Sequence, residues 1–235
     1  MDIELISEKE SLLILNLLRA NWKDHVFMER KNQWEFYEGQ QVIFKLRMPI
    51  TIVPPGIADP LKDEGMYYVL VLIRSGTAAI GCFFEGKNID HKIFRAYMVR
   101  KKQGKSQIKH LKTKGKSREG SRIRMAETFR FFENINERLN VYFDAYPIGR
   151  IGISCPATLT PYLYNSKEKP PFRKHDARIM KIPTHIANPT YDILNKSNGF
   201  LLHGELKYSE DGMEFLENIR GRSNHDKATD EEEDW

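Results

Sequence analysis

Three short apolar runs lie between residues 67 and 99, and they constrain the fold of this chain more than any other feature. The runs are Tyr67 to Ile73, Ala78 to Phe84 and Phe94 to Val99. The stretches between them contain glycine and polar residues, which is typical of tight connections between neighbouring antiparallel strands. The sequence therefore predicts a three-strand meander.

The second half of the chain alternates between helix and strand patterns. Four apolar residues repeat at helical spacing, namely Met125, Phe129, Phe132 and Leu139. The elements expected after this helix are a strand at 150–155, a short helix at 158–164, a strand at 177–182 and a helix that begins at Asn188-Pro189. Strands separated by helices indicate an α/β protein with a mixed β-sheet and packed helices.

The first 65 residues form a small segment of their own. Ser7 followed by Glu10 is a capping box that begins a helix. Short β-branched and aromatic stretches at 25–48 predict a hairpin, and a turn-rich connector follows. The expected divisions are an N-terminal helix-and-hairpin segment (1–65), a main domain (66–222) and an acidic tail (223–235) that is too polar to pack and is expected to be disordered.

Positive charge is concentrated in one segment. Residues 99–124, hereafter the basic segment, hold eleven bases and one acid, whereas the rest of the chain holds 26 bases and 31 acids. A local cationic patch that contains Gly and Ser favours a nucleic acid partner over a membrane surface. The candidate RNA-binding residues are Arg100, Lys101, Lys102, Lys105, Lys109, Lys112, Lys114, Lys116, Arg118, Arg122 and Arg124.

The tripeptide Gly-Lys-Ser occurs twice in the basic segment, but it does not form a nucleotide-binding loop. A Walker motif needs glycine five positions before the Gly of Gly-Lys-Ser, and those positions hold Val99 and His110. The histidines lack metal-ligand spacing, so we expect no metal and no cofactor. The separate cysteines, Cys82 and Cys155, indicate buried thiols in a reducing cytoplasm. No apolar run of membrane-spanning length and no signal segment occur, so we expect a cytoplasmic protein.

The stretch Gly104-Lys105-Ser106-Gln107 offers a flexible hinge and polar side chains without a carboxylate, imidazole or thiol. A glutamine amide both donates and accepts hydrogen bonds. Gln107 can therefore orient a water or a ribose hydroxyl at a reacting ester, while most of the chemistry comes from an RNA substrate.

The chain from the third strand through this stretch to Arg122-Ile123-Arg124 resembles the Vms-like release-factor domain. That family is related to the middle domain of eukaryotic and archaeal peptide-chain release factors. Gln107 stands at the family's glutamine, and Lys105 replaces the usual second glycine of the Gly-Gly-Ser-Gln loop. The resemblance continues at 176–183 and 188–190, and it covers about residues 66 to 200.

The resemblance implies a ribonuclease H-like fold, with Gly104, Ser106 and Gln107 as catalytic residues. Its implied partners are the peptidyl-transferase region of the large ribosomal subunit and peptidyl-tRNA, with no membrane and no small-molecule cofactor. The implied activity frees stalled nascent chains, either by hydrolysis of the peptidyl-tRNA ester or by cleavage of the tRNA 3′ acceptor end. The alternative is a non-catalytic ribosome- or RNA-binding module, which the change to Lys105 keeps open.

Overall fold

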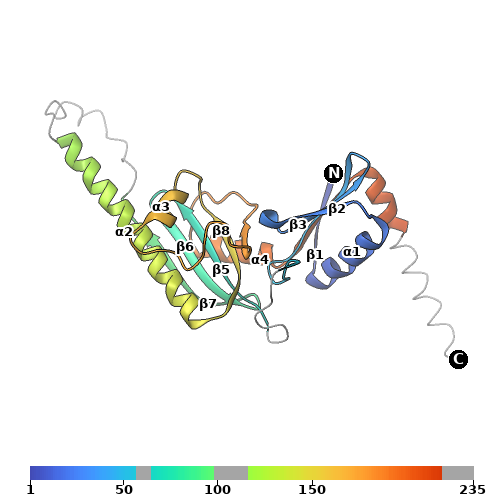
Figure 1. Ribbon diagram of the computed structural model, residues 1–235, viewed down its shortest axis with the longest axis horizontal. Coiled ribbons are helices and arrows are strands. Elements are labelled where there is room, and N and C mark those ends of the chain that lie inside the picture. The colour runs from blue at the N-terminus through green and yellow to red at the C-terminus, as the bar shows by residue number, and fades with distance from the viewer. Residues whose placement is uncertain (57–64, 98–115, 219–235) are drawn as a thin grey trace. The chain divides into compact units, whose positions relative to one another are not determined.

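Two β-sheets, each in its own compact unit, organise the chain in the computed structural model. The structure describes residues 1–56, 65–97 and 116–218 (Figure 1). The first unit contains Met1–Ile52 and the chain from Leu202 onward, and the second contains Val53–Leu201.

The first unit is an antiparallel sheet covered by helices. Its strands are β1 (Asp2–Ile6), β2 (His25–Met28), β3 (Gln33–Glu38), β4 (Gln41–Arg47) and β10 (Gly204–Tyr208), in the spatial order β1-β10-β4-β3-β2. A 3-10 turn, η1 (Glu29–Lys31), joins β2 to β3. Helix α1 (Glu8–Asn21) begins with the predicted capping box, since Ser7 Oγ accepts from the Glu10 amide and Glu10 Oε2 accepts from the Ser7 amide.

The core of this unit joins helix and sheet. Leu18 of α1, Phe36 of β3, Phe44 of β4 and Leu206 of β10 are fully buried in one apolar cluster. Residues 210–218 are also helical, and Leu216 belongs to the same cluster. The amphipathic pattern of each element therefore gives one closed core.

The second unit is a mixed sheet between helices. Its strands are β5 (Tyr67–Arg74), β6 (Thr77–Phe84), β7 (Lys87–Arg95), β8 (Ile148–Ser154) and β9 (Ile179–Lys181), in the spatial order β7-β6-β5-β8-β9. Strands β5, β6 and β7 pair antiparallel, which confirms a three-strand meander, but the apolar pattern places the third strand at Phe94 to Val99, whereas β7 is Lys87–Arg95. Most of β7 mixes exposed and partly buried residues, so it has no continuous apolar run to mark it. Strand β8 runs parallel to β5, and β9 runs parallel to β8. The class predicted from the sequence, a mixed α/β sheet with packed helices, is confirmed for this unit.

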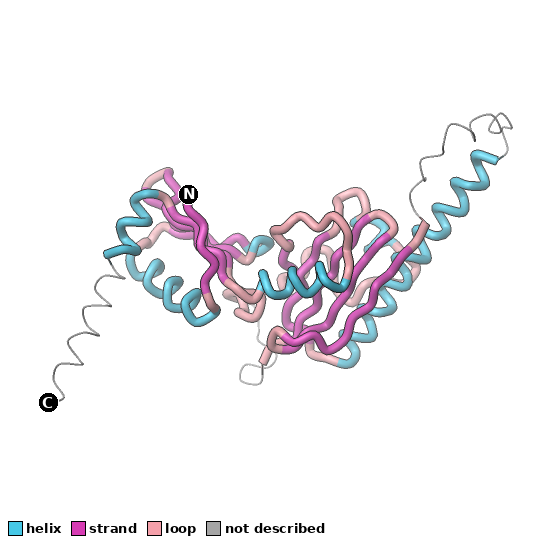
Figure 2. Tube along the Cα trace, turned by 180° about the vertical axis from the view of Figure 1, so that it is seen from behind, coloured by secondary structure: helices cyan, strands magenta, loops and turns pink. Residues whose placement is uncertain are grey.

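Helices cover both faces of the mixed sheet. Helices α2 (Lys116–Ala145) and α3 (Thr160–Asn165) lie on one face, where Phe132 and Leu139 pack on alternate residues of β5 such as Val71. Helix α4 (Tyr191–Leu201) lies on the other face, where Asn198 Oδ1 accepts from the Tyr68 hydroxyl. Figures 1 and 2 show these layers from opposite sides.

The predicted apolar stripe of α2 is only partly buried. Phe132 and Leu139 are fully buried as expected, but Met125 and Phe129 are 56% and 40% exposed. The first half of α2 extends past the edge of the sheet (Figure 1), so those two residues lack the packing surface that their neighbours have. Phe129 contacts Tyr162 of α3, with ring centroids 5.9 Å apart.

The units of the structure differ from the divisions expected from the sequence. The sequence pattern places the stretch 202–218 in the main domain, yet β10 is inserted between β1 and β4 of the first unit. Leu206 supplies the physical reason, because its burial in the first core completes the apolar face of that sheet. The acidic tail, 223–235, lies outside the described residues.

One buried charge in the second unit leads to a testable expectation. Arg150 of β8 is fully buried, and its three guanidinium nitrogens have no hydrogen-bond partner among the described residues. Burial lowers the pKa of this guanidinium to about 10. A buried polar group without a partner destabilises the folded state by about 1–3 kcal/mol.

Replacement of Arg150 by methionine should therefore raise the free energy of unfolding by about 1–3 kcal/mol, because it removes the unpartnered charge and keeps an apolar stem. Urea unfolding of the parent and of Arg150→Met measures the change. A loss of stability would instead mean that the guanidinium has an acceptor that the described residues do not provide.

Candidate functional site

The residues predicted to do chemistry lie outside the described part of the chain. These are Gly104, Ser106 and Gln107. Seven of the predicted RNA-binding residues also lie outside the described part of the chain, namely Arg100, Lys101, Lys102, Lys105, Lys109, Lys112 and Lys114. The remaining four, Lys116, Arg118, Arg122 and Arg124, lie on the first turns of α2, where the backbone alone is described.

The structure does describe the two elements that flank this segment. Strand β7 ends at Arg95, and the Ala96 amide then donates to the Gly76 carbonyl at 2.9 Å. On the other side, α2 begins at Lys116 and packs against the sheet through Phe132, Ile135 and other buried residues. The basic segment therefore follows an ordered strand and continues into the first turns of a long helix.

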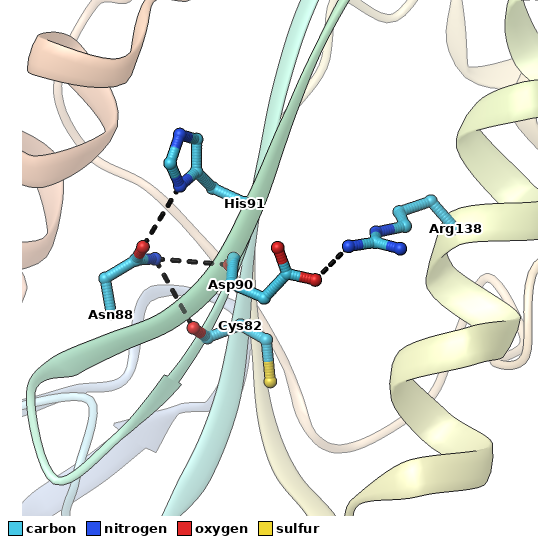
Figure 3. A network of polar contacts seen from close by, with 5 residues as sticks. All are labelled: Cys82, Asn88, Asp90, His91 and Arg138. Atoms are coloured by element: carbon cyan, nitrogen blue, oxygen red, sulfur yellow. Dashed lines mark hydrogen bonds and ion pairs between the residues drawn. The ribbon is translucent and has the colours of Figure 1, made fainter.

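An ion pair joins these two flanking elements directly. Arg138 of α2 donates through Nη2 to Asp90 Oδ2 of β7 (Figure 3). The guanidinium also lies over the ring of Tyr142, 4.9 Å from its centroid. Burial raises the pKa of the Tyr142 hydroxyl, and the neighbouring guanidinium opposes that shift. The contact fixes the second half of α2 on the edge strand that leads to the basic segment.

A second set of contacts shapes the same part of β7. Asn88 Nδ2 donates to the carbonyls of Cys82 at 3.4 Å and Asp90 at 3.2 Å, and Asn88 Oδ1 lies 3.2 Å from His91 Nδ1 (Figure 3). The pairing of β6 with β7 shifts register here, so the Asn88 side chain satisfies a carbonyl at the irregularity. His91 stacks on Tyr191 of α4 with ring centroids 4.1 Å apart.

Substitution of Arg138 should weaken the contact between α2 and β7. Arg138→Met loses the ion pair and the cation–π contact while it retains an apolar stem, so we expect the free energy of unfolding to fall by roughly 1 kcal/mol. Arg130→Met is the matched control, because Arg130 is exposed on the same helix. Equal urea midpoints for the two variants would show that the Asp90 contact does not stabilise the fold.

The cysteines do not provide a reactive nucleophile. Burial raises the pKa of the Cys82 thiol to about 11, and burial also raises the pKa of the Cys155 thiol. Both groups are therefore mainly protonated at neutral pH, whereas the thiolate is the reactive form. Within 1–56, 65–97 and 116–218, no three His, Cys, Asp or Glu side chains are grouped as a metal site would require. No helix of these ranges has the length and apolar character needed to cross a bilayer.

Sequence reasoning did not single out Asp90 and Arg138. Both are ordinary charged residues 48 positions apart, and their proximity depends on how α2 packs on the sheet. The sequence contains one signal for this ion pair: opposite charges occur on the two elements that flank the basic segment, Asp90 in the strand and Arg138 in the helix.

The described site thus belongs to a mixed α/β domain in which one basic segment connects an edge strand to a long helix. The family model described as the Bacteroidetes VLRF1 release factor matches residues 68–209, which is more than half of the chain. The chain therefore belongs to the Bacteroidetes VLRF1 release factor family, which confirms the resemblance found in the sequence.

A solved structure titled "Vms1 mitochondrial localization core" is also similar to this chain. The two share 12% sequence identity with a TM-score of 0.45, and the alignment covers 88% of this chain and 91% of the other. No curated protein sequence matches this chain at a significant level.

Proposed function

We propose that this protein frees stalled nascent chains at the ribosome, by hydrolysis of the peptidyl-tRNA ester or by cleavage of the tRNA 3′ acceptor end. The observation that carries the proposal is the family match, because its range of 68–209 contains the basic segment with Gln107. Membership in a release-factor family favours the ribosome and tRNA as partners, with the peptidyl-transferase region as the place of action.

The proposed roles follow from the chemistry of each side chain. The Gln107 amide orients the attacking hydroxyl, which is water in ester hydrolysis and a ribose hydroxyl in tRNA cleavage. Gly104 gives the backbone its conformational freedom, and Ser106 adds a hydroxyl beside the glutamine. The bases on either side hold RNA phosphates, and the ordered flanks β7 and α2 limit where the segment can reach.

A non-catalytic RNA-binding module of the same family is the second candidate. The observation that favours it is Lys105, which replaces the usual second glycine of the loop. A β-carbon disfavours the positive φ values that glycine adopts readily, so the lysine limits the geometry available beside Gln107.

Stalled ribosomes that carry peptidyl-tRNA, labelled on both the peptide and the tRNA, test the proposal. An intact tRNA that keeps its terminal CCA, together with free peptide, indicates ester hydrolysis. A shortened tRNA indicates cleavage of the acceptor end. Retained ribosome binding with neither product would contradict the proposed activity and support the binding module.

A further inference from the structure

The connection between α3 and β9, residues 166–178 and hereafter the proline loop, is fixed to helix α2 by two asparagines. Asn136 is fully buried, and its Nδ2 lies 2.8 Å from each of three acceptors, Leu163 O, Ser166 Oγ and Glu168 O. Asn140, one turn later, donates to Glu168 Oε1 at 2.5 Å and to the Lys169 carbonyl at 3.1 Å. A loop with this many backbone anchors is held in one conformation.

An apolar contact anchors the other half of the proline loop. Phe172 is 4% exposed and lies 5.8 Å from Phe143 of α2 and 6.3 Å from Tyr164, measured between ring centroids. Residues 170–176 line a surface hollow of about 680 Å³ around this anchor. The aromatic ring is therefore buried beneath the loop, whereas the lysines of the loop and Arg173 are exposed.

The outer side of the proline loop is positively charged. The loop holds five bases and two acids. Arg178 donates to both oxygens of Asp176, at 3.0 and 2.7 Å, and this holds the pKa of the Asp176 carboxyl below its ordinary value. The other acid, Glu168, accepts from Asn140. The remaining cationic side chains are all exposed, namely Lys167, Lys169, Arg173 and Lys174.

We propose that the proline loop is a second binding surface for an RNA phosphate backbone, separate from the basic segment. The inference rests on the proposed function in that it assigns a further contact to the same RNA-bound factor. Several cations held on one ordered loop are suited to contact RNA phosphates. Because Phe172 is buried, its ring is not available to stack on RNA bases.

The distance between the two basic regions limits which RNA can contact both. Arg124, the last base of the basic segment, lies on helix α2, and the loop anchor Asn136 is 12 residues further along it. A rise of 1.5 Å per residue separates these points by about 18 Å along the helix axis. A mononucleotide cannot bridge that distance, so the ligand is an extended or folded RNA that contacts two positions along one rigid helix.

Charge reversal in the proline loop tests the inference. We compare the parent with Lys167→Glu/Arg173→Glu, and with Lys23→Glu/Lys196→Glu as a control that makes the same change in net charge at exposed positions outside the loop. Lys196 lies on α4, which covers the opposite face of the sheet. Affinity for a fluorescently labelled RNA hairpin is measured over a range of salt concentrations, and circular dichroism checks that each variant is folded.

The loop variant should bind the hairpin at least about tenfold more weakly at low salt. Its plot of log affinity against log salt should flatten by about two units, because each of the two reversed side chains no longer neutralises a phosphate. The control should keep the parent slope. Equal slopes for the loop variant and the parent, or equal reductions in loop variant and control, would overturn the inference. The inference would also be overturned if the loop variant bound polyglutamate more weakly than the parent does but bound RNA equally well. That result would favour an acidic protein partner.

Single-turnover peptide release, measured with the same preparations, separates this inference from the proposed function. If the parent releases no peptide and the loop variant has lost RNA affinity, the release activity is contradicted and the second RNA surface is supported. A loop variant that matches the parent in RNA affinity and slope would reject the second surface even where the parent releases peptide.

Discussion

Gln107→Ala should reduce peptide release from saturated, stalled ribosomes by roughly 10²-fold or more, the scale expected when one positioned polar group is removed from an active site. The alanine cannot orient an attacking hydroxyl or donate to developing charge. Ribosome affinity should remain nearly unchanged, because one neutral side chain contributes little beside the eleven bases of the basic segment. Single-turnover release, with binding measured in parallel, separates the two effects.

Two neighbouring substitutions control for the shape of the loop. Gly104→Ala should slow release if the backbone there needs a conformation that glycine alone adopts easily. Lys105→Gly should be tolerated, and it restores the residue that is usual at this position in Vms-like domains. Wild-type release by Gln107→Ala, together with normal binding, would exclude the glutamine as the catalytic residue and would refute its assignment from the family.

The elements that could be predicted from the sequence are those with local signals. The capping box at Ser7 and Glu10 involves residues three apart, and the hairpin of β5 and β6 joins two apolar runs through a short turn. Strand β7 has no continuous apolar run, so the pattern places it at Phe94 to Val99 and not at Lys87–Arg95. Strand β10 has no comparable signal. Its partners, β1 and β4, lie more than 150 residues earlier, so its place depends on a long-range pairing that local periodicity does not encode.

The same distinction explains what the sequence could not show at the candidate site. Helical periodicity identifies the face of α2 that contains Phe129 and Phe132, but it cannot show where the sheet beneath that face ends. The charge bias of the basic segment is visible in the sequence because the bases are contiguous. The proline loop is also basic in the sequence, with five bases and two acids, but its attachment to α2 through Asn136 and Asn140 depends on the fold.

The basic segment should provide the larger share of ribosome binding. Reversal of Lys112, Lys114 and Lys116 to glutamate should weaken ribosome association strongly and flatten its salt dependence by about three units, since each phosphate that is no longer neutralised removes about one unit of slope. A triple reversal of Lys9, Lys23 and Lys196 is the matched control, because these lysines are exposed and lie outside the basic segment. Cosedimentation with ribosomes over a series of salt concentrations gives both quantities.

Combination of this triple variant with Lys167→Glu/Arg173→Glu then tests whether the two basic regions act independently. Sites that are far apart and share no partners have additive effects. At a separation of at least about 18 Å along α2, the reductions in slope should add to about five units if both regions bind RNA. A combined reduction no larger than that of the triple variant alone would assign all of the RNA binding to the basic segment. If the triple reversal does not change cosedimentation, the basic segment does not bind RNA. The proposed position of Gln107 at the peptidyl-tRNA would then have no electrostatic support.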